Sequence, residues 1–259
     1  MKTSGNTILM TGGGSGIGEA LAHRFHDLGN TVIVAGRRKE ALDRSIAGRA
    51  NMHAVTFDAA DAGHVPSFAK ELIAAFPALN VLINNAGIMT YERIDTARPL
   101  DDAEAMITTN LLGPIRLIDA LVDHLARQAD AAIVNVTSGL GFVPLLGAPT
   151  YSATKAALHS YTVSLREALK SKVEVIEIAP PGVQTDLTPG QSTREGYQPL
   201  DSFADEVMNL FQQQPTPAEI LVEKVRPFRF AEAEGNFDRI FAQLTEVSKR
   251  NAAEVARKS

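Results

Sequence analysis

The chain lacks cysteine altogether: none occurs among its 259 residues. This absence excludes disulfide bonds, thiolate metal sites and cysteine nucleophiles together, and it fits the cytoplasmic location that we predict. Long apolar runs are also missing, since none approaches the roughly 20 residues that a membrane-spanning helix needs. Residues 1–15 contain one lysine and a three-residue apolar run before Thr11, too short for a signal peptide.

The chain also has little excess charge, with a formal net charge of −5. A weakly acidic chain does not favour nucleic acid or an anionic membrane surface as a partner. Its six histidines show no His-Glu-x-x-His pattern, so we expect no metal site. His159 follows Lys155 by one helical turn and is interpreted as a helix-face residue rather than a catalytic base.

Short apolar strands and amphipathic helices alternate along the chain, with no repeat and no linker. The expected strands are Thr7–Thr11, Thr31–Ala35, Met52–Phe57, Val81–Asn84, Ala131–Thr137 and Val173–Ile178. The expected helices are Gly16–Leu28, Lys39–Ala47, Val65–Phe76, Asp101–Arg127, Tyr151–Lys170 and Asp201–Gln213. Continuous Val/Ile/Leu strands alternating with helices indicate parallel strands buried on both faces. We predict one α/β domain over 1–259: a doubly wound parallel sheet of the Rossmann type in three α/β/α layers.

In such sheets, ligands bind beyond the carboxyl ends of the strands. The segments that follow the strands are Gly12–Gly18, Gly36–Arg38, Asp58, Asn84–Gly87, Thr137-Ser138 and Pro180–Thr185. They are distant in sequence, but the fold brings them to one rim.

A glycine loop connects the first strand to the first helix, as Thr11-Gly12-Gly13-Gly14-Ser15-Gly16-Ile17-Gly18. Glycines let the backbone turn tightly and approach a pyrophosphate, while the helix N-terminus offers free N–H groups. We therefore predict that Gly12, Gly14, Ser15, Gly16, Ile17 and Gly18 bind a dinucleotide. Asn84-Asn85-Ala86-Gly87 suits close packing beside a cofactor, although an ordinary turn uses the same residue types.

The end of the second strand bears on the choice of dinucleotide. An acidic residue there hydrogen-bonds the adenosine ribose of NAD, but this chain has Gly36 followed by Arg37 and Arg38. Guanidinium groups pair well with a phosphate, so the pattern favours NADP(H) over NAD(H). The alternative is that both arginines are solvated loop residues and the chain accepts either cofactor. Ser15, in the glycine loop, adds no further positive charge to pair with this phosphate.

Tyr151 and Lys155 lie four residues apart on a predicted helix and so project from one face. A cation beside a phenol favours the phenolate, and we expect it to lower the tyrosine pKa. Such a tyrosine can donate and accept a proton. Ser138 ends the fifth strand and can hydrogen-bond a substrate carbonyl. It lacks the Gly-x-Ser-x-Gly context of a hydrolase nucleophile. A tyrosine and a lysine spaced like Tyr151 and Lys155 also occur on ordinary surface helices.

Residues 5–190 resemble the short-chain dehydrogenase/reductase family in its single-domain branch. The resemblance rests on Thr11-Gly12-x-x-x-Gly16-x-Gly18, Asn84-Asn85-Ala86-Gly87, Asn110, Ser138, Tyr151-x-x-x-Lys155 and Pro181-Gly182-Val183-x-Thr185. It implies that Tyr151 exchanges a proton with the substrate, Lys155 binds the nicotinamide ribose, and Ser138 polarises the carbonyl. It also implies that Asn110 holds a water joining Lys155 to solvent. The cofactor contacts that it implies are Asp58, Asn85, Ala86, Gly87, Tyr151, Lys155, Pro181, Gly182, Val183 and Thr185.

The resemblance weakens after Asp186. We expect a substrate lid at about 186–214, with Leu187, Leu200, Phe203 and Met208 lining a pocket or, alternatively, packing a helix on the core. The tail at 234–250 is amphipathic and helical, and it is similar to the bacterial DltE-like branch. Because no seventh strand is expected there, the helices Asp101–Arg127 and Tyr151–Lys170 become the expected surface of a homodimer.

The main hypothesis is an NADP(H)-dependent oxidoreductase that transfers a hydride between nicotinamide and a small carbonyl or alcohol substrate. A non-catalytic NADP(H)-binding regulator is the alternative, and the presence of Ser138, Tyr151 and Lys155 together argues against it. A sugar-nucleotide epimerase or dehydratase on an extended scaffold is disfavoured by chain length and glycine spacing.

Overall fold

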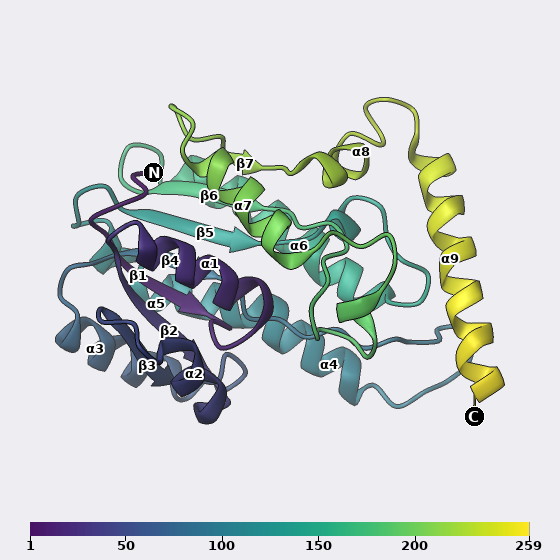
Figure 1. Cartoon of the computed structure of the whole chain (residues 1–259), viewed down its shortest axis with the longest axis horizontal. Coiled ribbons are helices and arrows are strands. Elements are labelled where there is room, and N and C mark those ends of the chain that lie inside the picture. Colours follow the sequence, from purple (N-terminus) through teal and green to yellow (C-terminus); the bar gives the residue numbers. More distant parts are fainter. Residues whose placement is uncertain (259) are drawn as a thin grey trace.

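The computed structural model describes residues 1–258, with side chains as far as Lys249. Its centre is a seven-stranded parallel sheet in the order β3-β2-β1-β4-β5-β6-β7 (Figure 1). The strands are β1 Thr7–Thr11, β2 Thr31–Gly36, β3 Met52–Thr56, β4 Leu79–Asn84, β5 Ala132–Val136, β6 Glu174–Ile178 and β7 Glu219–Ile220. The order reverses between β1 and β4, so the crevice expected of a doubly wound sheet opens there. The predicted fold class is confirmed.

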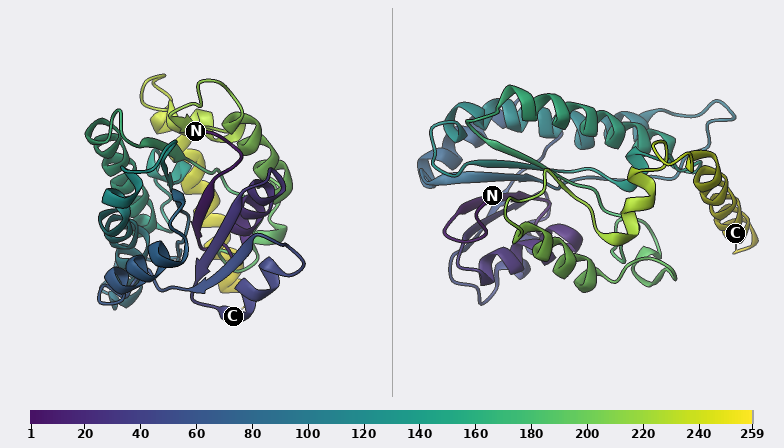
Figure 2. Two further views of the ribbon diagram at one scale, coloured as in Figure 1. Left: turned by 90° about the vertical axis from the view of Figure 1, so that its left-hand side faces the viewer. Right: turned by 90° about the horizontal axis from the view of Figure 1, so that it is seen from above.

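Helices cover both faces of the sheet, giving the three predicted layers (Figure 2). They are α1 Gly16–Asp27, α2 Lys39–Ile46, α3 Val65–Ala75, α4 Asp101–Ile107, α5 Gly113–Leu125, α6 Pro149–Ala168, α7 Leu200–Phe211, α8 Arg226–Arg229 and α9 Phe237–Lys258. Alternate strand residues divide between the faces, as successive side chains of a strand must. Met10 packs with α1 and α7, whereas Leu9 packs with α3 and α5. Both clusters are apolar, which accounts for the continuous Val/Ile/Leu strands.

The predicted helix Asp101–Arg127 is divided in the structure. A π-helical turn, Thr108–Leu112, separates α4 from α5. The stretch Asp101–Leu125 is long and apolar enough to cross a membrane by length and composition. However, Leu117, Leu121 and Leu125 pack against the sheet, so it is a core helix of a globular fold. The expectation that no apolar stretch approaches membrane-spanning length therefore needs this correction.

A seventh strand, missed by the sequence analysis, pairs with β6 through only Glu219 and Ile220. Two residues are too few to show an alternating or apolar pattern. The predicted tail helix is present as α9 and begins at Phe237. It runs past the edge of the molecule toward which the strand arrowheads point (Figure 1, yellow).

The hypothesis that Phe203 and Met208 line a substrate pocket is wrong. Both lie in the core, with Phe203 fully buried, because α7 packs against α1. The ring of Phe211 contacts that of Phe25 edge-on at 5.5 Å between centroids. Leu200 also packs on this core, and Leu187 is exposed. Of the expected lid, only the loop before α7 therefore faces the rim.

Candidate active site

The glycine loop and the end of β4 are locked together at the reversal point of the sheet. The Asn85 amide donates to the Thr11 carbonyl at 3.0 Å, and the Thr11 hydroxyl accepts from the backbone N–H of Asn85 and Ala86. A Cβ on Gly12 would lie 2.8 Å from Asn85 Nδ2, and one on Gly18 would lie 2.4 Å from it. The Asn84–Gly87 motif thus has a structural role in holding the loop, in addition to its predicted place beside a cofactor.

The first turn of α1 offers backbone donors at this rim. Ser15 is the N-cap residue, but its side chain makes no capping hydrogen bond. The N–H groups of an uncapped first turn have no intrahelical partner, and the helix dipole favours an anion beside them. Gly16 has a φ of +57°, which an L side chain rarely adopts, and a Cβ on it would lie 3.5 Å from Thr185. Two predicted cofactor segments, far apart in sequence, therefore meet here.

Arg37 and Arg38 follow β2, and both are exposed. Arg38 Nη2 donates to Ser15 Oγ at 3.1 Å, so this guanidinium lies beside the glycine loop. Within the described residues, neither arginine pairs with a carboxylate. Asp58 follows β3 and accepts a hydrogen bond from the N–H of Ala60 at 2.9 Å. The structure thus collects the predicted adenosine-side residues along the ends of β1, β2 and β3.

Ser138, Tyr151 and Lys155 come together beyond the end of β5. All three are at least nine-tenths buried. Burial raises the pKa of Tyr151 to about 12, a contact with the Ser138 hydroxyl lowers it less strongly, and Tyr197 raises it. Burial also lowers the pKa of Lys155 to about 8. Its Nζ donates to the Val136 carbonyl at 2.8 Å.

The expected lowering of the Tyr151 pKa by Lys155 is wrong for this structure. Lys155 Nζ lies 5.7 Å from the centre of the Tyr151 ring, but burial of the phenol outweighs every other influence on its pKa. The shift keeps Tyr151 protonated at neutral pH, the form that can donate a proton.

Asn110 occupies the π-helical turn and is fully buried. Its Oδ1 accepts from the N–H of Ile88 at 2.9 Å, and its Nδ2 donates to the Ile88 carbonyl at 2.8 Å. A Cβ on Gly87 would lie 3.3 Å from Asn110 Oδ1 and 3.6 Å from Lys155 Nζ, so the three residues adjoin. π-Helical turns within α-helices often mark functional sites. In this one, Asn110 faces the loop after β4.

Several residues near Tyr151 were not predicted from the sequence. Leu244 of α9 packs on the apolar cluster that contains Tyr151. The ring of Tyr197, from the loop before α7, lies 3.0 Å from where a Cβ of Gly182 would be. Arg194 joins this ring to Tyr91, a residue of the loop after β4. The long irregular loop before α7 was the one feature of the sequence that pointed to these residues. No sequence pattern shows that side chains from three separate segments meet.

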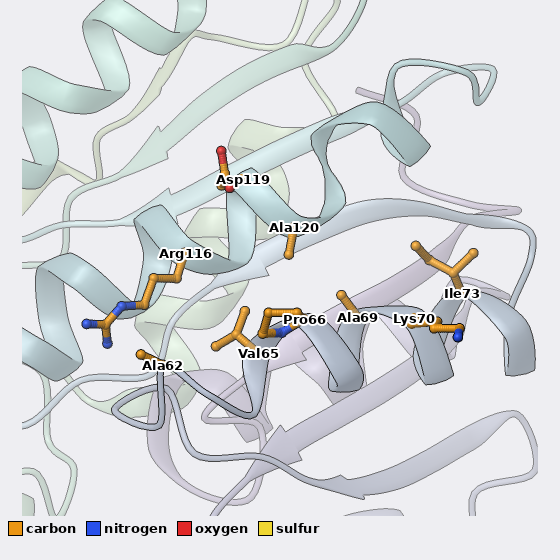
Figure 3. Close-up of a pocket in the computed structure, with 9 residues that line it drawn as sticks. All are labelled: Ala62, Val65, Pro66, Ala69, Lys70, Ile73, Arg116, Asp119 and Ala120. Atoms are coloured by element: carbon orange, nitrogen blue, oxygen red, sulfur yellow. The ribbon is translucent and has the colours of Figure 1, made fainter.

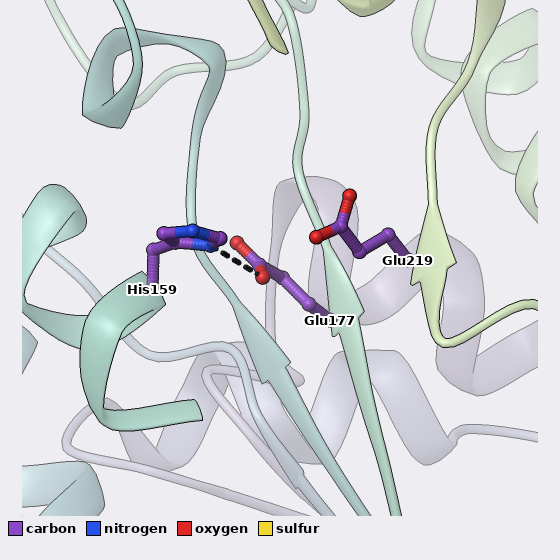
Figure 4. Close-up of side chains that lie close together, drawn as sticks. All are labelled: His159, Glu177 and Glu219. Atoms are coloured by element: carbon purple, nitrogen blue, oxygen red, sulfur yellow. Dashed lines mark hydrogen bonds and ion pairs between the residues drawn. The ribbon is translucent and has the colours of Figure 1, made fainter. Parts of the chain in front are cut away.

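His159, Glu177 and Glu219 form a charged cluster that adjoins Thr137, the residue before Ser138 (Figure 4). Their ligand atoms lie within 4.8 Å of one another, as a metal site would require. The buried Glu177, however, accepts from the Thr137 hydroxyl at 2.6 Å and bonds His159 Nδ1 at 2.8 Å. Arg229 pairs with both oxygens of Glu219. Because protein donors already engage these carboxylates, we assign the cluster to a charged network joining α6, β6 and β7.

Two grooves lie elsewhere on the described part of the chain. One, of about 500 Å³, runs between α3 and α5 and is lined by Val65, Ala69, Lys70, Arg116 and Asp119, among others (Figure 3). The second lies beside residues Met1 and Lys2, at the edge of the sheet opposite to the carboxyl ends of the strands. No predicted site residue lines either groove, so we place the chemistry at the rim.

Comparison with known proteins gives a consistent picture. Residues 6–196 match the model of the family described as short chain dehydrogenase. The chain is 38% identical over 250 residues to the uncharacterized oxidoreductase DltE of Bacillus subtilis, covering 94% of this chain and 98% of that one. An uncharacterized oxidoreductase of Staphylococcus aureus is 33% identical, covering 85% and 96%.

Solved structures resemble the chain throughout the sheet. A serine dehydrogenase complexed with NADP+ superposes with a TM-score of 0.73 at 26% identity, covering 82% of this chain and 90% of that one. A 3-ketoacyl-(acyl-carrier-protein) reductase of Brucella melitensis, complexed with NADH, gives a TM-score of 0.74 at 24% identity, covering 84% and 96%. The latter likeness concerns the fold alone.

Proposed function

The chain belongs to the short-chain dehydrogenase family and is an oxidoreductase of that family, and from this premise we propose that it reduces a small carbonyl compound with NADPH or oxidises the corresponding alcohol with NADP+. The observation that carries the proposal is the convergence of Ser138, Tyr151 and Lys155 at the rim of the sheet. A dinucleotide-binding regulator has no need for a buried phenol in contact with a serine hydroxyl.

The rim has the features that a nicotinamide dinucleotide needs. The uncapped first turn of α1 presents N–H donors to a pyrophosphate, and Gly16 leaves space for its close approach. Thr185 and the Asn85–Gly87 segment border the same loop. When bound there, the cofactor supplies or accepts the hydride, and the protein supplies position, a proton and electrostatics.

Each catalytic residue has a distinct role in the proposed reduction. The Tyr151 hydroxyl donates its proton to the carbonyl oxygen, and the Ser138 hydroxyl hydrogen-bonds the same oxygen as negative charge develops on it. Lys155 provides a cation beside the phenol and binds the ribose. Asn110 fixes the loop after β4 through both atoms of its amide. Its predicted water relay to Lys155 remains part of the proposal.

The proposal is tested with NADPH and a panel of aldehydes, ketones and diketones, following NADPH absorbance. Tyr151→Phe removes the proton donor but keeps the ring, so turnover should fall by about 100-fold or more. NADPH affinity, measured by fluorescence titration, should change little. Normal turnover by this variant would contradict the assignment of Tyr151. NADPH binding by the wild type with no turnover across the panel would favour the regulator instead.

The proposed preference for NADP(H) rests on the two exposed arginines. Arg38 is held against Ser15, and an acidic residue is absent at the end of β2, where Gly36 stands. A charge-assisted hydrogen bond contributes roughly 1.5–3 kcal/mol, so removing both guanidinium groups should weaken NADP(H) binding about 10-fold or more. NAD(H) binding should hardly change in the Arg37→Ala, Arg38→Ala double variant. Equal loss for both cofactors would show that the arginines do not read the phosphate.

A homodimer and a cytoplasmic location complete the proposal. Val163 of α6 and Ile107 of α4 are 46% and 42% exposed, and burial of such side chains against a second copy would be favourable. Val163→Asp should then yield monomers in size-exclusion chromatography with light scattering. A wild-type chain that is monomeric at all concentrations would contradict this surface.

A further inference from the structure

Arg194, Tyr91 and Tyr197 form a cluster beside the catalytic tyrosine, here called the arginine clamp. Arg194 Nη1 donates to the Tyr91 hydroxyl at 2.8 Å and to the Tyr197 hydroxyl at 3.2 Å. Its guanidinium also lies over the Tyr197 ring, with the central carbon 5.2 Å from the ring centre. Two hydroxyls and one aromatic face therefore hold the guanidinium in a fixed orientation.

The positive charge of the clamp has no carboxylate partner among the side chains described, residues 1–249. Among the side chains that the structure describes, no carboxylate pairs with Arg194, and its Nε and Nη2 have no hydrogen-bond partner. The nearby carboxylate of Glu92 is buried and already bound, by Arg98 at 2.7 Å and by the Thr150 hydroxyl at 2.9 Å. Together, Nε and Nη2 form the side-on fork with which arginine binds a carboxylate through two parallel hydrogen bonds.

The clamp is attached to the catalytic rim through the loop that follows β6. The backbone N–H of Gln198 donates to the Gly182 carbonyl at 2.8 Å, and that of Gln184 donates to the Gln198 carbonyl at 2.9 Å. These bonds fasten the segment after Arg194 to the loop that follows β6. Tyr197 is close enough to Tyr151 to raise its pKa electrostatically. Tyr197 thus contacts the guanidinium and also acts electrostatically on the proposed proton donor.

We propose that Arg194 binds a carboxylate of the substrate, so that the chain interconverts an oxo acid and a hydroxy acid. This inference rests on the proposed function and names its substrate class. A single guanidinium matches the single negative charge of a carboxylate, whereas a phosphate monoester would leave charge unpaired. In reduction, a C–H bond forms from the NADPH hydride, the carbonyl π bond breaks, and its oxygen takes the Tyr151 proton. NADPH is oxidised to NADP+, and the carboxylate is unchanged.

The test compares each acid with its neutral methyl ester. The panel contains 2-oxopentanoate, 3-oxopentanoate and 4-oxopentanoate with their esters, which varies the distance between the carboxylate and the carbonyl, and dihydroxyacetone phosphate as a phosphate-bearing substrate. For the wild type, kcat/KM should be higher for at least one acid than for its ester. Arg194→Gln should lower kcat/KM for that acid about 10- to 150-fold, because a hydrogen bond to a charged group contributes roughly 1.5–3 kcal/mol. The ester should be affected less than about threefold.

Matched variants separate the possible failures. Arg93→Gln removes an exposed arginine paired with Asp95 and should leave both substrates unchanged. Tyr197→Phe keeps the ring but removes one of the two hydroxyls that accept from the guanidinium, so it should reduce acid turnover selectively and by less than Arg194→Gln. Tyr151→Phe should abolish turnover of acid and ester alike; normal turnover in that variant refutes the proposed function.

Other outcomes overturn the clamp while leaving the proposed function standing. These are equal losses for acid and ester in Arg194→Gln, or a preference for the phosphate-bearing substrate. A binding measurement covers the case in which no panel member turns over. Calorimetric titration of 3-hydroxybutyrate into the NADP+ complex should show binding to the wild type and at least tenfold weaker binding to Arg194→Gln; equal binding to both overturns the inference.

Discussion

Lys155 carries a stability cost that its replacement should reveal. Its side chain is buried, pairs with no carboxylate among the described residues, and has its pKa lowered from 10.5 to about 8. One pKa unit corresponds to about 1.4 kcal/mol, so the shift amounts to roughly 3 kcal/mol. Lys155→Met keeps the length of the stem and removes the charge, at the loss of one hydrogen bond to Val136 worth roughly 1 kcal/mol.

The net expectation is that Lys155→Met stabilises the cofactor-free chain by about 2 kcal/mol at pH 7. That is an increase in Tm of about 4–8 °C for a chain of this size. The variant should at the same time lose NADPH-dependent turnover. A gain in stability at the expense of activity is what a buried catalytic cation predicts.

The pH dependence makes the prediction specific. Because the folded-state pKa of Lys155 lies below its unfolded value, the wild type loses stability as pH falls from 10.5 to about 8. The difference between variant and wild type should be constant below pH 8. Above it, the difference should shrink by about 1.4 kcal/mol per pH unit and reverse sign between about pH 9 and 10. Urea unfolding of both proteins from pH 7 to 10.5 measures this difference in the free energy of unfolding.

A control and a clear refutation are available. Lys170→Met replaces an exposed lysine whose one carboxylate partner among the described residues is Glu167, so it should alter stability little at any pH in this range. If Lys155→Met is less stable than the wild type at pH 7, or if the difference does not vary with pH, Lys155 is not held in a destabilising environment.

Three further predictions concern the elements around the site. Gly18→Ala places a methyl group 2.4 Å from Asn85 Nδ2 and should lower both Tm and NADPH affinity; an unchanged Tm would mean that the loop relaxes freely. Phe211→Ala should cost about 3–5 kcal/mol in urea unfolding, since its ring is fully buried against Phe25, and a loss below 1 kcal/mol would contradict that packing. Leu244→Asp puts a carboxylate in the apolar cluster of Tyr151 and should lower kcat/KM while NADPH affinity stays constant, as titration would show.

Much of the fold was predictable because its signals are local. Strand Thr7–Thr11 was predicted with its observed bounds, since five apolar or β-branched residues end at a glycine loop. Alternating strands and helices with right-handed crossovers predict a doubly wound parallel sheet, and the rim follows from the strand ends. Ser138 was predictable because it follows a buried strand, and Tyr151 and Lys155 because they lie one turn apart on one helix.

What could not be predicted depends on contacts between distant segments. The π-helical turn at Asn110 is stabilised by two bonds to Ile88, a partner 22 residues away. Phe203 carries the same apolar signal whether it lines a pocket or packs in the core, and only its burial in the structure decides between them. The pKa of Tyr151 follows from desolvation, which needs the packed structure. β7 exists because β6 presents a free edge to two residues.

The proposed site around Tyr151 is built from two separate sets of segments, and this arrangement has an evolutionary consequence. The proposed cofactor side is built from residues 11–18 and 84–87, where a Cβ on Gly12, Gly13 or Gly18 would lie 2.8 Å, 2.6 Å or 2.4 Å from a neighbouring atom. The opposite wall of the proposed site comes from the loop carrying Arg194 and from Leu244 of α9, and among the described residues neither is hydrogen-bonded to residues 11–18. Mutation can therefore change the residues proposed to bind the substrate while those proposed to bind the cofactor stay the same. Paralogues of this chain should differ first at α9 and the Arg194 loop, and drift in specificity should leave the dinucleotide crevice intact.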